Sequence, residues 1–447
     1  MMFLLQVTML MVFFSKGHAS TYSNTNAGLT SVPSVIPEVE IVNLDNNGIA
    51  TIDSKDFELL TNMKDLDLSN NNITVISQDA FYNNPLEQLD LSHNPIKTVP
   101  LFSPLVNTLT HLNLTACQIS NTTWDLVVHY ESLIDLNLEE NQLNTVPNLT
   151  KSANSLQTLN MGKNNIEILE ARELDGLNSL REIIFKECNI KHVSGQLKIS
   201  SLRTLDLQNN HIDQFPDISQ LSTLKRIHLN SNKLPNIPKD AFRNNGILYL
   251  DIFSNLLTQL PNIDDIKDTL KSFACGQNPI AMIPADYFEG CGTLSYIGFS
   301  NFHMTSLSWL RYVGPSVWRV YLKSLQISGN IPADIFVNAS GMKELVLSNN
   351  SITHFEMSSL QHMPLLKILN IDSNNLGSLE DPHFYCRGST CINLEINAAN
   401  NPIPCDVNMC WAKANPSITL VRDSCLGKTW EAVTVDDLQC TGSKISI

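Results

Sequence analysis

Leucine and isoleucine recur along this chain in one fixed pattern of the form LxxLxLxxNxL. The pattern is clearest in LEQLDLSHNPI (86–96), LIDLNLEENQL (133–143), LRTLDLQNNHI (202–212) and LKILNIDSNNL (366–376). Side chains of a strand alternate between its two faces, so the two leucines of LxL point inward and their neighbours point outward. Each copy therefore predicts one short strand of a parallel sheet.

An asparagine, or a substitute for it, marks one position of every copy. In order, these positions are Asn47, Asn71, Asn94, Cys117, Asn141, Asn164, Cys188, Asn210, Asn232, Asn255, Asn278, Phe302, Leu325, Asn350, Asn374 and Asn401. Their mean spacing of about 23.6 residues lies within the range of roughly 20–29 residues that leucine-rich repeats have. A buried amide can pair with backbone groups of the adjacent turn, which would each cost about 1–3 kcal/mol if left unpaired. We expect a ladder of about sixteen repeats, with Cys117 and Cys188 as buried structural thiols in it.

A phenylalanine follows several ladder positions at a distance of ten residues. These are Phe57, Phe81, Phe242, Phe288 and Phe384. Such regular spacing predicts a stack of rings in the core beneath the convex side.

The first nineteen residues predict a secretory signal peptide. An apolar run from Met1 to Phe14 precedes the small residues Gly17 and Ala19. The run is shorter than the ~20 residues that span a membrane, and no longer one follows. Residues 441–447 have neither a hydrophobic end nor a lipidation motif. We expect the mature chain to be secreted and extracellular.

The net charge and the glycosylation sequons limit the classes of partner that the chain is expected to bind. A net charge of −15 disfavours nucleic acid, because phosphate binding needs a basic face. Asn-x-Ser/Thr triplets predict glycosylation at Asn72, Asn113, Asn121, Asn148, Asn338 and Asn349. Asn113 lies between two strand leucines, so a sugar there obstructs the outward face of the fourth repeat.

With these repeats, the sequence resembles the extracellular leucine-rich-repeat family from about Val39 to Cys440. NPIPC (401–405) and the nearby Trp411 resemble the cysteine-rich C-terminal domain that covers the exposed last repeat of such solenoids. The resemblance implies an α/β solenoid, a leucine-rich-repeat horseshoe with short parallel strands on the concave face and a disulfide-bonded C-terminal cap. The expected order is an N-terminal segment without a cysteine cap (20–38), repeats (39–403), cap (404–440) and tail (441–447). Either frayed residues 20–28 or a partner on the open edge is consistent with the missing N-terminal cap.

Six cysteines near the C-terminus allow several pairings. The resemblance favours Cys405 with Cys425, Cys410 with Cys440, and Cys386 with Cys391 as a local loop. The family usually begins its cap with C-x-C, but Val407 occupies the second place here. Zinc binding is the alternative, and an oxidising compartment and the lack of C-x-x-C pairs argue against it.

No arrangement of residues predicts catalysis. Asp67, Asp90, Asp206 and Asp251 share one outward strand position, so we interpret them as a solvated row and not as a convergent acid/base pair. G-x-S-x-G, H-E-x-x-H and phosphate-binding glycine loops are absent from the sequence. We expect no enzyme, no cofactor and no metal site.

The outward strand positions change in character along the chain. Early repeats carry Asp45, Asp65, Asp67, Asp90, Asp135 and Glu139, whereas repeats ten, twelve and thirteen carry Tyr249, Phe253, Tyr296, Arg319 and Tyr321. Repeat eleven between them has only Ser272, Ala274 and Gly276, which predicts a groove flanked by rings. Aromatic rings and arginine are frequent at binding hot spots, so we expect the partner here. The alternative is an irregular region beside Phe302 and Leu325, in which a one-residue slip turns Tyr321 inward.

Two functions fit these features. The first is a secreted non-enzymatic protein that recognises a protein or a glycan on its concave face. The second is an accessory or structural subunit of a secreted complex. NPIPC followed closely by tryptophan is also similar to secreted arthropod repeat proteins that resemble the non-catalytic subunit of a shrimp luciferase.

Overall fold

The computed structural model describes residues 20–35, 38–98, 102–120, 130–382, 393–414, 418–422, 425 and 428–440. The expected signal peptide, Asn121, Phe384, the Cys386–Cys391 pair and the tail lie outside the described residues. In the part that is described, no helix has the length and apolar character needed to cross a membrane.

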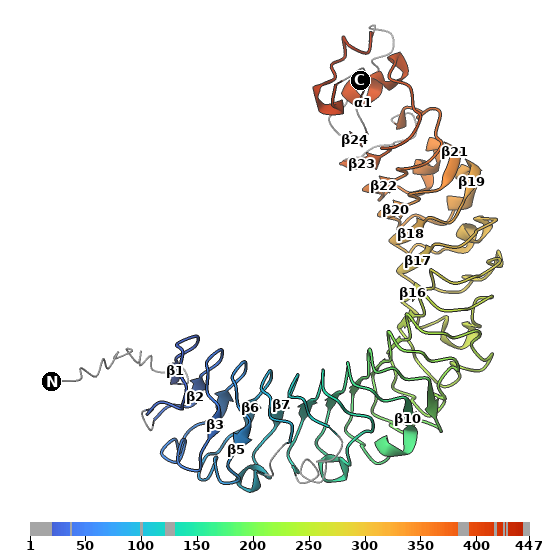
Figure 1. Ribbon diagram of the computed structural model, residues 1–447. Helices are drawn as coiled ribbons and strands as arrows, with labels where there is room; N and C mark the ends of the chain where they lie inside the picture. The colour runs from blue at the N-terminus through green and yellow to red at the C-terminus, as the bar shows by residue number, and fades with distance from the viewer. Residues whose placement is uncertain are drawn as a thin grey trace, which may run out of the picture. The chain divides into compact units, whose positions relative to one another are not determined.

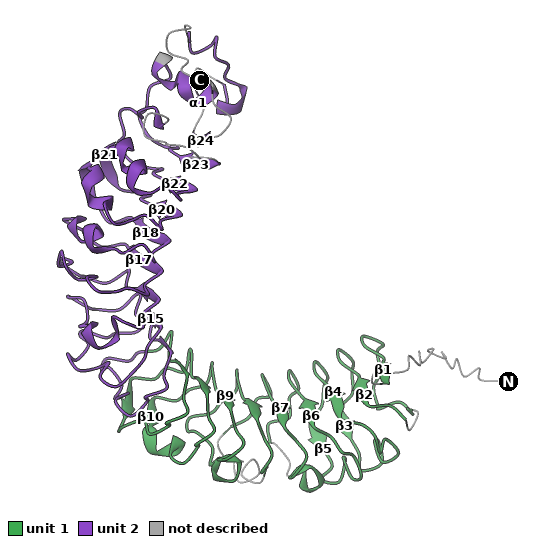
Figure 2. Ribbon diagram, turned by 180° about the vertical axis from the view of Figure 1, so that it is seen from behind, with its two compact units in different colours: residues 1–210 green, residues 211–447 purple. Residues whose placement is uncertain are grey.

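The protein is a parallel-strand solenoid of about 16 turns, and its chain divides into two compact units, residues 1–210 and 211–447 (Figure 2). In the first unit the sheet contains β1 (Thr21–Ser23), β2 (Ile41–Asn43), β4 (Asp65–Asp67), β6 (Gln88–Asp90), β7 (His111–Asn113), β8 (Asp135–Asn137), β9 (Thr158–Asn160), β11 (Glu182–Ile184) and β13 (Thr204–Asp206). In the second unit it contains β14 (Arg226–His228), β15 (Tyr249–Asp251), β16 (Ser272–Ala274), β17 (Tyr296–Ser300), β18 (Arg319–Lys323), β20 (Glu344–Val346), β22 (Ile368–Asn370), β23 (Leu394–Asn397) and β24 (Ile418–Val421) (Figure 1).

Shorter elements return the chain from one strand to the next. Parallel pairs form between β3 (Thr51–Ile52) and β5 (Val75–Ile76), β10 (Ile168–Glu170) and β12 (His192–Ser194), and β19 (Ser328–Ile331) and β21 (Ser351–Phe355). The 3₁₀ turns are Ser103–Leu105, Thr150–Ser152, Ala171–Leu174, Asp264–Ile266, Ser308–Tyr312, Ala333–Phe336, Met357–His362, Val407–Met409 and Trp430–Ala432, and α1 is Cys410–Ala414.

The strand register follows the leucine pattern. Leu66 in the middle of β4 pairs with Leu89 of β6, and Leu89 pairs with Leu112 of β7. All three side chains are buried. In-register parallel pairing places the same repeat position of every turn on the same face. The predicted core therefore forms, and four of the five predicted phenylalanines, Phe57, Phe81, Phe242 and Phe288, are buried in it. The rings of Phe57 and Phe81 are stacked, with their centroids 5.9 Å apart.

The asparagine ladder is present, and Asn164 shows its geometry. The Asn164 Oδ1 accepts the Leu143 N–H at 3.0 Å, and Nδ2 donates to the Leu138 carbonyl of the preceding turn at 2.9 Å. Nδ2 also approaches the carbonyls of Met161 and Gly162 in its own turn. One buried amide thus pairs backbone groups of two consecutive turns, which would otherwise lose their water without replacement.

The residue before each ladder position adopts a left-handed backbone conformation, which turns the chain. All sixteen have φ between 53° and 60°, among them Asn301 and Ser324, which precede Phe302 and Leu325. Leu325 also donates its N–H to Asn350 Oδ1, as Cys117 does to Asn141 Oδ1. Phe302 and Leu325 therefore occupy ladder positions in register, and the interpretation of this region as slipped is wrong.

Cys117 and Cys188 are buried free thiols, as predicted. Their sulfur atoms lie 3.2 Å from the Leu91 carbonyl and 3.0 Å from the Met161 carbonyl, which are the carbonyls that an asparagine amide would reach. Burial raises the pKa of each thiol to about 12. A thiol can therefore replace one of the hydrogen bonds of the amide while remaining protonated and unreactive.

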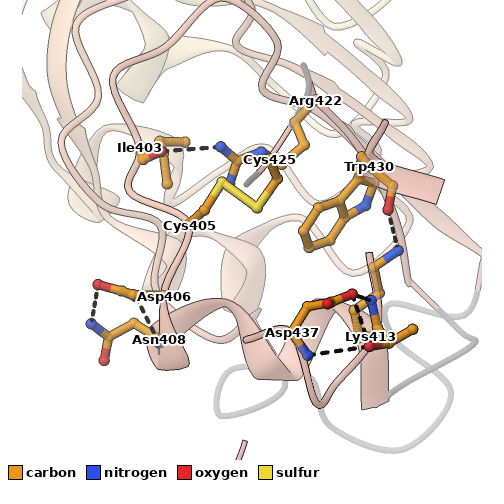
Figure 3. Close-up of a disulfide and its surroundings, with 10 residues drawn as sticks. Ile403, Cys405, Asp406, Asn408, Lys413, Arg422, Cys425, Trp430 and Asp437 are labelled. Atoms are coloured by element: carbon orange, nitrogen blue, oxygen red, sulfur yellow. Dashed lines mark hydrogen bonds between the residues drawn. A yellow bond between two sulfur atoms is a disulfide. The ribbon is translucent and has the colours of Figure 1, made fainter. Parts of the chain in front are cut away.

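The C-terminal cap continues the sheet and is held by two disulfides. Cys405 is bonded to Cys425 and Cys410 to Cys440, which are the pairings that the family resemblance implies. β24 pairs with β23, so the cap adds a strand to the last repeat. Around the first disulfide, Lys413 and Arg422 approach the Trp430 ring, at 4.2 and 5.4 Å from its centroid (Figure 3).

The N-terminal segment pairs with the first repeat. β1 pairs with β2, and the Ala27 and Leu29 N–H groups donate to Asn47 Oδ1. These residues supply the partners that a preceding repeat would supply. The suggestion that residues 20–28 are frayed is therefore wrong.

We expect Asn164→Ala to destabilise the fold, because each backbone group left buried and unpaired costs about 1–3 kcal/mol. Asn164→Cys should cost less, since cysteine already serves at two ladder positions. Asn165→Ala is the control, because Asn165 is the exposed neighbour and surface changes stay within about 0.5 kcal/mol. Urea unfolding measures all three, and equal losses at Asn164 and Asn165 would contradict the ladder.

Cys117 and Cys188 should react with iodoacetamide only after denaturation, because their raised pKa keeps them as thiols near neutral pH. Peptide mapping without reduction should join Cys405, Cys410, Cys425 and Cys440 only to one another. A bridge between Cys117 and the cap would show that the repeat register is wrong.

Candidate partner-binding surface

The outward strand face of the first unit is acidic. Asp65, Asp67, Asp90 and Asp135, which we call the acidic face, line a hollow of about 300 Å³ together with His111. Burial raises the pKa of Asp65, and the neighbouring Asp67 and Asp90 raise it further. Burial also raises the pKa of Asp135. In the described residues, no group of three or more His, Cys, Asp or Glu side chains is placed to hold a metal ion.

The aspartates between the strand leucines are structural and not a freely solvated row. Asp67 Oδ1 accepts the Ser69 N–H at 2.9 Å, and Asp90 accepts the Ser92 N–H at 2.8 Å. The same bond to the residue two places on is made by Asp206, Asp251, Asn43, Asn113, Asn137, Asn160, Asn370 and Asn397. A short polar side chain that bonds its own backbone in this way favours the turn that ends each strand. The recurrence of Asp or Asn at this position was the sequence signal for it.

The five residues expected to bind a partner lie together in the second unit. Tyr249, Phe253, Tyr296, Arg319 and Tyr321, here called the ring surface, are all partly exposed. In the register, Arg319 pairs with Tyr296, and Ser272 lies between Tyr249 and Tyr296. Tyr321 faces outward, since Val320 and Leu322 on either side of it are buried.

Two of the rings, those of Tyr296 and Phe253, lie across glycines of the sheet. A methyl group on Gly298 would be 2.5 Å from the Tyr296 hydroxyl oxygen and 3.0 Å from two of its ring carbons. A methyl group on Gly276 would be 2.9 Å from the Phe253 ring. At Gly276 the expected groove is therefore filled by the Phe253 ring, and we call the surface that Phe253 and Tyr296 form over the two glycines the floor.

Two arginines lie over tyrosine rings of this surface. The Arg226 guanidinium lies 4.7 Å from the Tyr249 ring centroid, and that of Arg319 lies 5.8 Å from the Tyr296 centroid. Arg319 also forms an ion pair of 3.0 Å with Glu344. Burial raises the pKa of the Tyr296 phenol, and Arg319 opposes that rise. The sequence analysis missed Arg226 and Glu344, although both occupy the strand position that Tyr249 and Arg319 have in adjacent repeats.

A further hollow of about 660 Å³ lies among the turns that follow β17 and β18. Met304, Leu307, Arg311, Ile331 and Asp334 are among the residues that line it. It lies away from the ring surface, next to the two repeats in which Phe302 and Leu325 replace the ladder asparagine. An apolar residue cannot pair the backbone groups that the amide joins in the other turns.

Comparisons with known proteins agree with the repeat assignment. Residues 37–96 and 319–376 match the Leucine rich repeat family, and residues 151–262 and 215–309 match the BspA type Leucine rich repeat region (6 copies). Lumican from Coturnix japonica is 28% identical over 258 residues, which are 55% of this chain and 72% of lumican. Keratocan from Gallus gallus is 28% identical over 246 residues, which are 54% of this chain and 63% of keratocan.

Among solved structures, a chain of the Toll–Spatzle complex from Drosophila is similar with a TM-score of 0.64 and 17% identity, over 89% of this chain and 63% of that chain. At this identity the likeness concerns the fold alone. The repeats, the sheet register and these matches together show a leucine-rich-repeat solenoid with homology to lumican and keratocan.

Proposed function

We propose that this chain is a secreted binding protein that recognises an extracellular protein or glycan on the ring surface. The observation that carries the proposal is the gathering of Tyr249, Phe253, Tyr296, Arg319 and Tyr321 on the outward face of β15–β18. Lumican and keratocan, which are extracellular matrix proteins, support an extracellular role. The signal peptide expected at residues 1–19 agrees with it.

The ring surface suits binding better than core packing. The inward residues Val320 and Leu322 fill the core of this turn, and the outward rings lie on the opposite face of the sheet. Arg226 and Arg319 restrain two of the rings. Side chains that are already restrained lose little conformational entropy when a partner covers them, which favours affinity.

An accessory or structural subunit of a secreted complex is the second candidate function, and the NPIPC stretch followed closely by Trp411 is the sequence feature that favours it. Affinity capture from the native secretion followed by mass spectrometry separates the two. A partner present at constant stoichiometry indicates a subunit, whereas a ligand captured only after challenge indicates a recognition protein.

Single replacements of Tyr249, Tyr296 and Tyr321 by alanine should weaken capture by about tenfold or more, as expected for hot-spot residues. The thermal midpoint should stay unchanged, because these side chains lie outside the core. Tyr82→Ala is the matched control, since Tyr82 is 59% exposed in the first unit. A collapse of the midpoint in the three variants would show that the rings are core residues.

Glycan mapping should find a sugar on Asn113, which would exclude a large ligand from the acidic face. The Asn113 Nδ2 donates to Asp90 at 2.8 Å, and its Oδ1 accepts the Thr115 N–H. A glycosylated amide keeps one N–H and its oxygen, so both bonds can persist. If Asn113 is bare while the other sequons carry sugar, the acidic face becomes accessible and this argument for the ring surface is lost.

A further inference from the structure

We propose that the ring surface binds an uncharged oligosaccharide, whose sugar rings stack on Tyr296 and Phe253. This inference rests on the proposed function, because it assigns a ligand class to the same surface. It follows from the orientation of the two rings, the shape of the surface and the pairing of its charges.

The orientation of the rings is the first observation. Tyr296 lies along its own strand over Gly298, and Phe253 reaches across to the next strand over Gly276. The atoms nearest to a methyl group at these glycines are the hydroxyl oxygen and two ring carbons of Tyr296, and one ring carbon of Phe253 among three atoms at Gly276. The two glycines are on neighbouring strands, which lie ~4.8 Å apart, and we call the two partly exposed rings above them the platform.

The shape of the platform favours a sugar over a peptide anchor. Protein hot spots are typically side chains inserted into desolvated pockets. The hollows described above, on the acidic face and beside Phe302, contain none of the ring-surface residues. A flat aromatic face instead fits the C–H face of a pyranose, whose partly positive hydrogens meet the negative face of the ring.

Polar groups border the platform where the hydroxyl groups of a stacked sugar would point. The Asp251 carboxylate and the Ser272 hydroxyl lie on β15 and β16, on the outward face and partly exposed. Tyr321, which also carries a hydroxyl group, pairs with Gly298 in the register and is partly exposed. A few placed polar groups around an apolar face are the usual composition of a small-molecule site.

The charges of the platform are largely compensated. Arg319 is paired with Glu344 at 3.0 Å, Arg226 lies over Tyr249, and Asp251 is on the outward face of the same strand as Tyr249. The whole chain carries a net charge of −15. A sulfated or uronic acid chain would need an excess of cations that this surface lacks, so the ligand class is neutral.

Gly298→Ala tests the platform with little risk to the fold. The three atoms nearest to the new methyl group all belong to the Tyr296 side chain, and the backbone of Gly298 is outside the left-handed region. Tyr296 must therefore leave its position, while the strand remains. Gly314→Ala in the same unit is the matched control, because a methyl group there meets nothing within 4 Å.

The experiment is calorimetric titration of the full-length secreted protein with chitohexaose, cellohexaose and heparin. We expect binding of at least one of the two neutral hexasaccharides, weakened about tenfold or more by Gly298→Ala and by Phe253→Ala and unchanged by Gly314→Ala. Binding that persists in both platform variants would overturn the inference, since the sugar would then lie elsewhere. Binding of heparin alone, lost as salt is raised, would also overturn it.

The same variants separate this inference from the proposed function. If neither hexasaccharide binds, but Gly298→Ala and Tyr249→Ala reduce capture of a protein from the native secretion, the ligand is a protein and only the glycan inference fails. If neither sugar binding nor protein capture depends on the ring surface, both fail.

Discussion

A buried asparagine amide that joins two consecutive turns is the interaction on which the rest of this structure depends. Each turn contributes only a short strand, so much of its backbone lies in tight loops. The N–H and C=O groups of these loops have no partner in the β-sheet. Unpaired groups of that kind cost about 1–3 kcal/mol each, which is large beside a net folding stability of about 5–15 kcal/mol. The amide of Asn164 shows how one side chain removes that cost by bonding two turns at once. The thiols of Cys117 and Cys188 make only part of the same set of bonds.

This constraint leaves few positions in a repeat free to vary. Inward strand positions carry leucine or its equivalents, and the central outward position is usually Asp or Asn bonded to its own backbone. On β16–β18 that central position is instead Ala274, Gly298 and Tyr321, and the ladder position is Phe302 and then Leu325 in two successive turns. Both structural rows are thus interrupted where the ring surface lies. Natural sequences depart from local structural rules most often at functional sites, and here the departure creates the space over which the rings lie.

Much of the fold was predictable from the sequence, because the LxL alternation and the ladder position act through local backbone geometry. Even Phe302 and Leu325 were placed correctly from spacing alone, as the left-handed residues before them show. The position of Tyr296 over Gly298 could not be predicted, since it depends on a rotamer and on the neighbouring strand. The interpretation of the aspartates as a solvated row was wrong. A carboxylate that accepts a hydrogen bond from its own backbone and one that faces water have the same sequence pattern. The pairing of β1 with β2 was missed because residues 20–28 lack the leucine pattern.

The proposed recognition surface consists of the rings on β15–β18 and excludes the acidic face. Hydroxyl-radical footprinting of the secreted protein with and without its captured partner tests this most directly. We expect oxidation of Tyr249, Phe253, Tyr296 and Tyr321 to fall when the partner is bound, while the exposed Tyr82 and Tyr312 are unaffected. Unchanged oxidation of the four rings, together with protection of residues around Asp65 and His111, would contradict it.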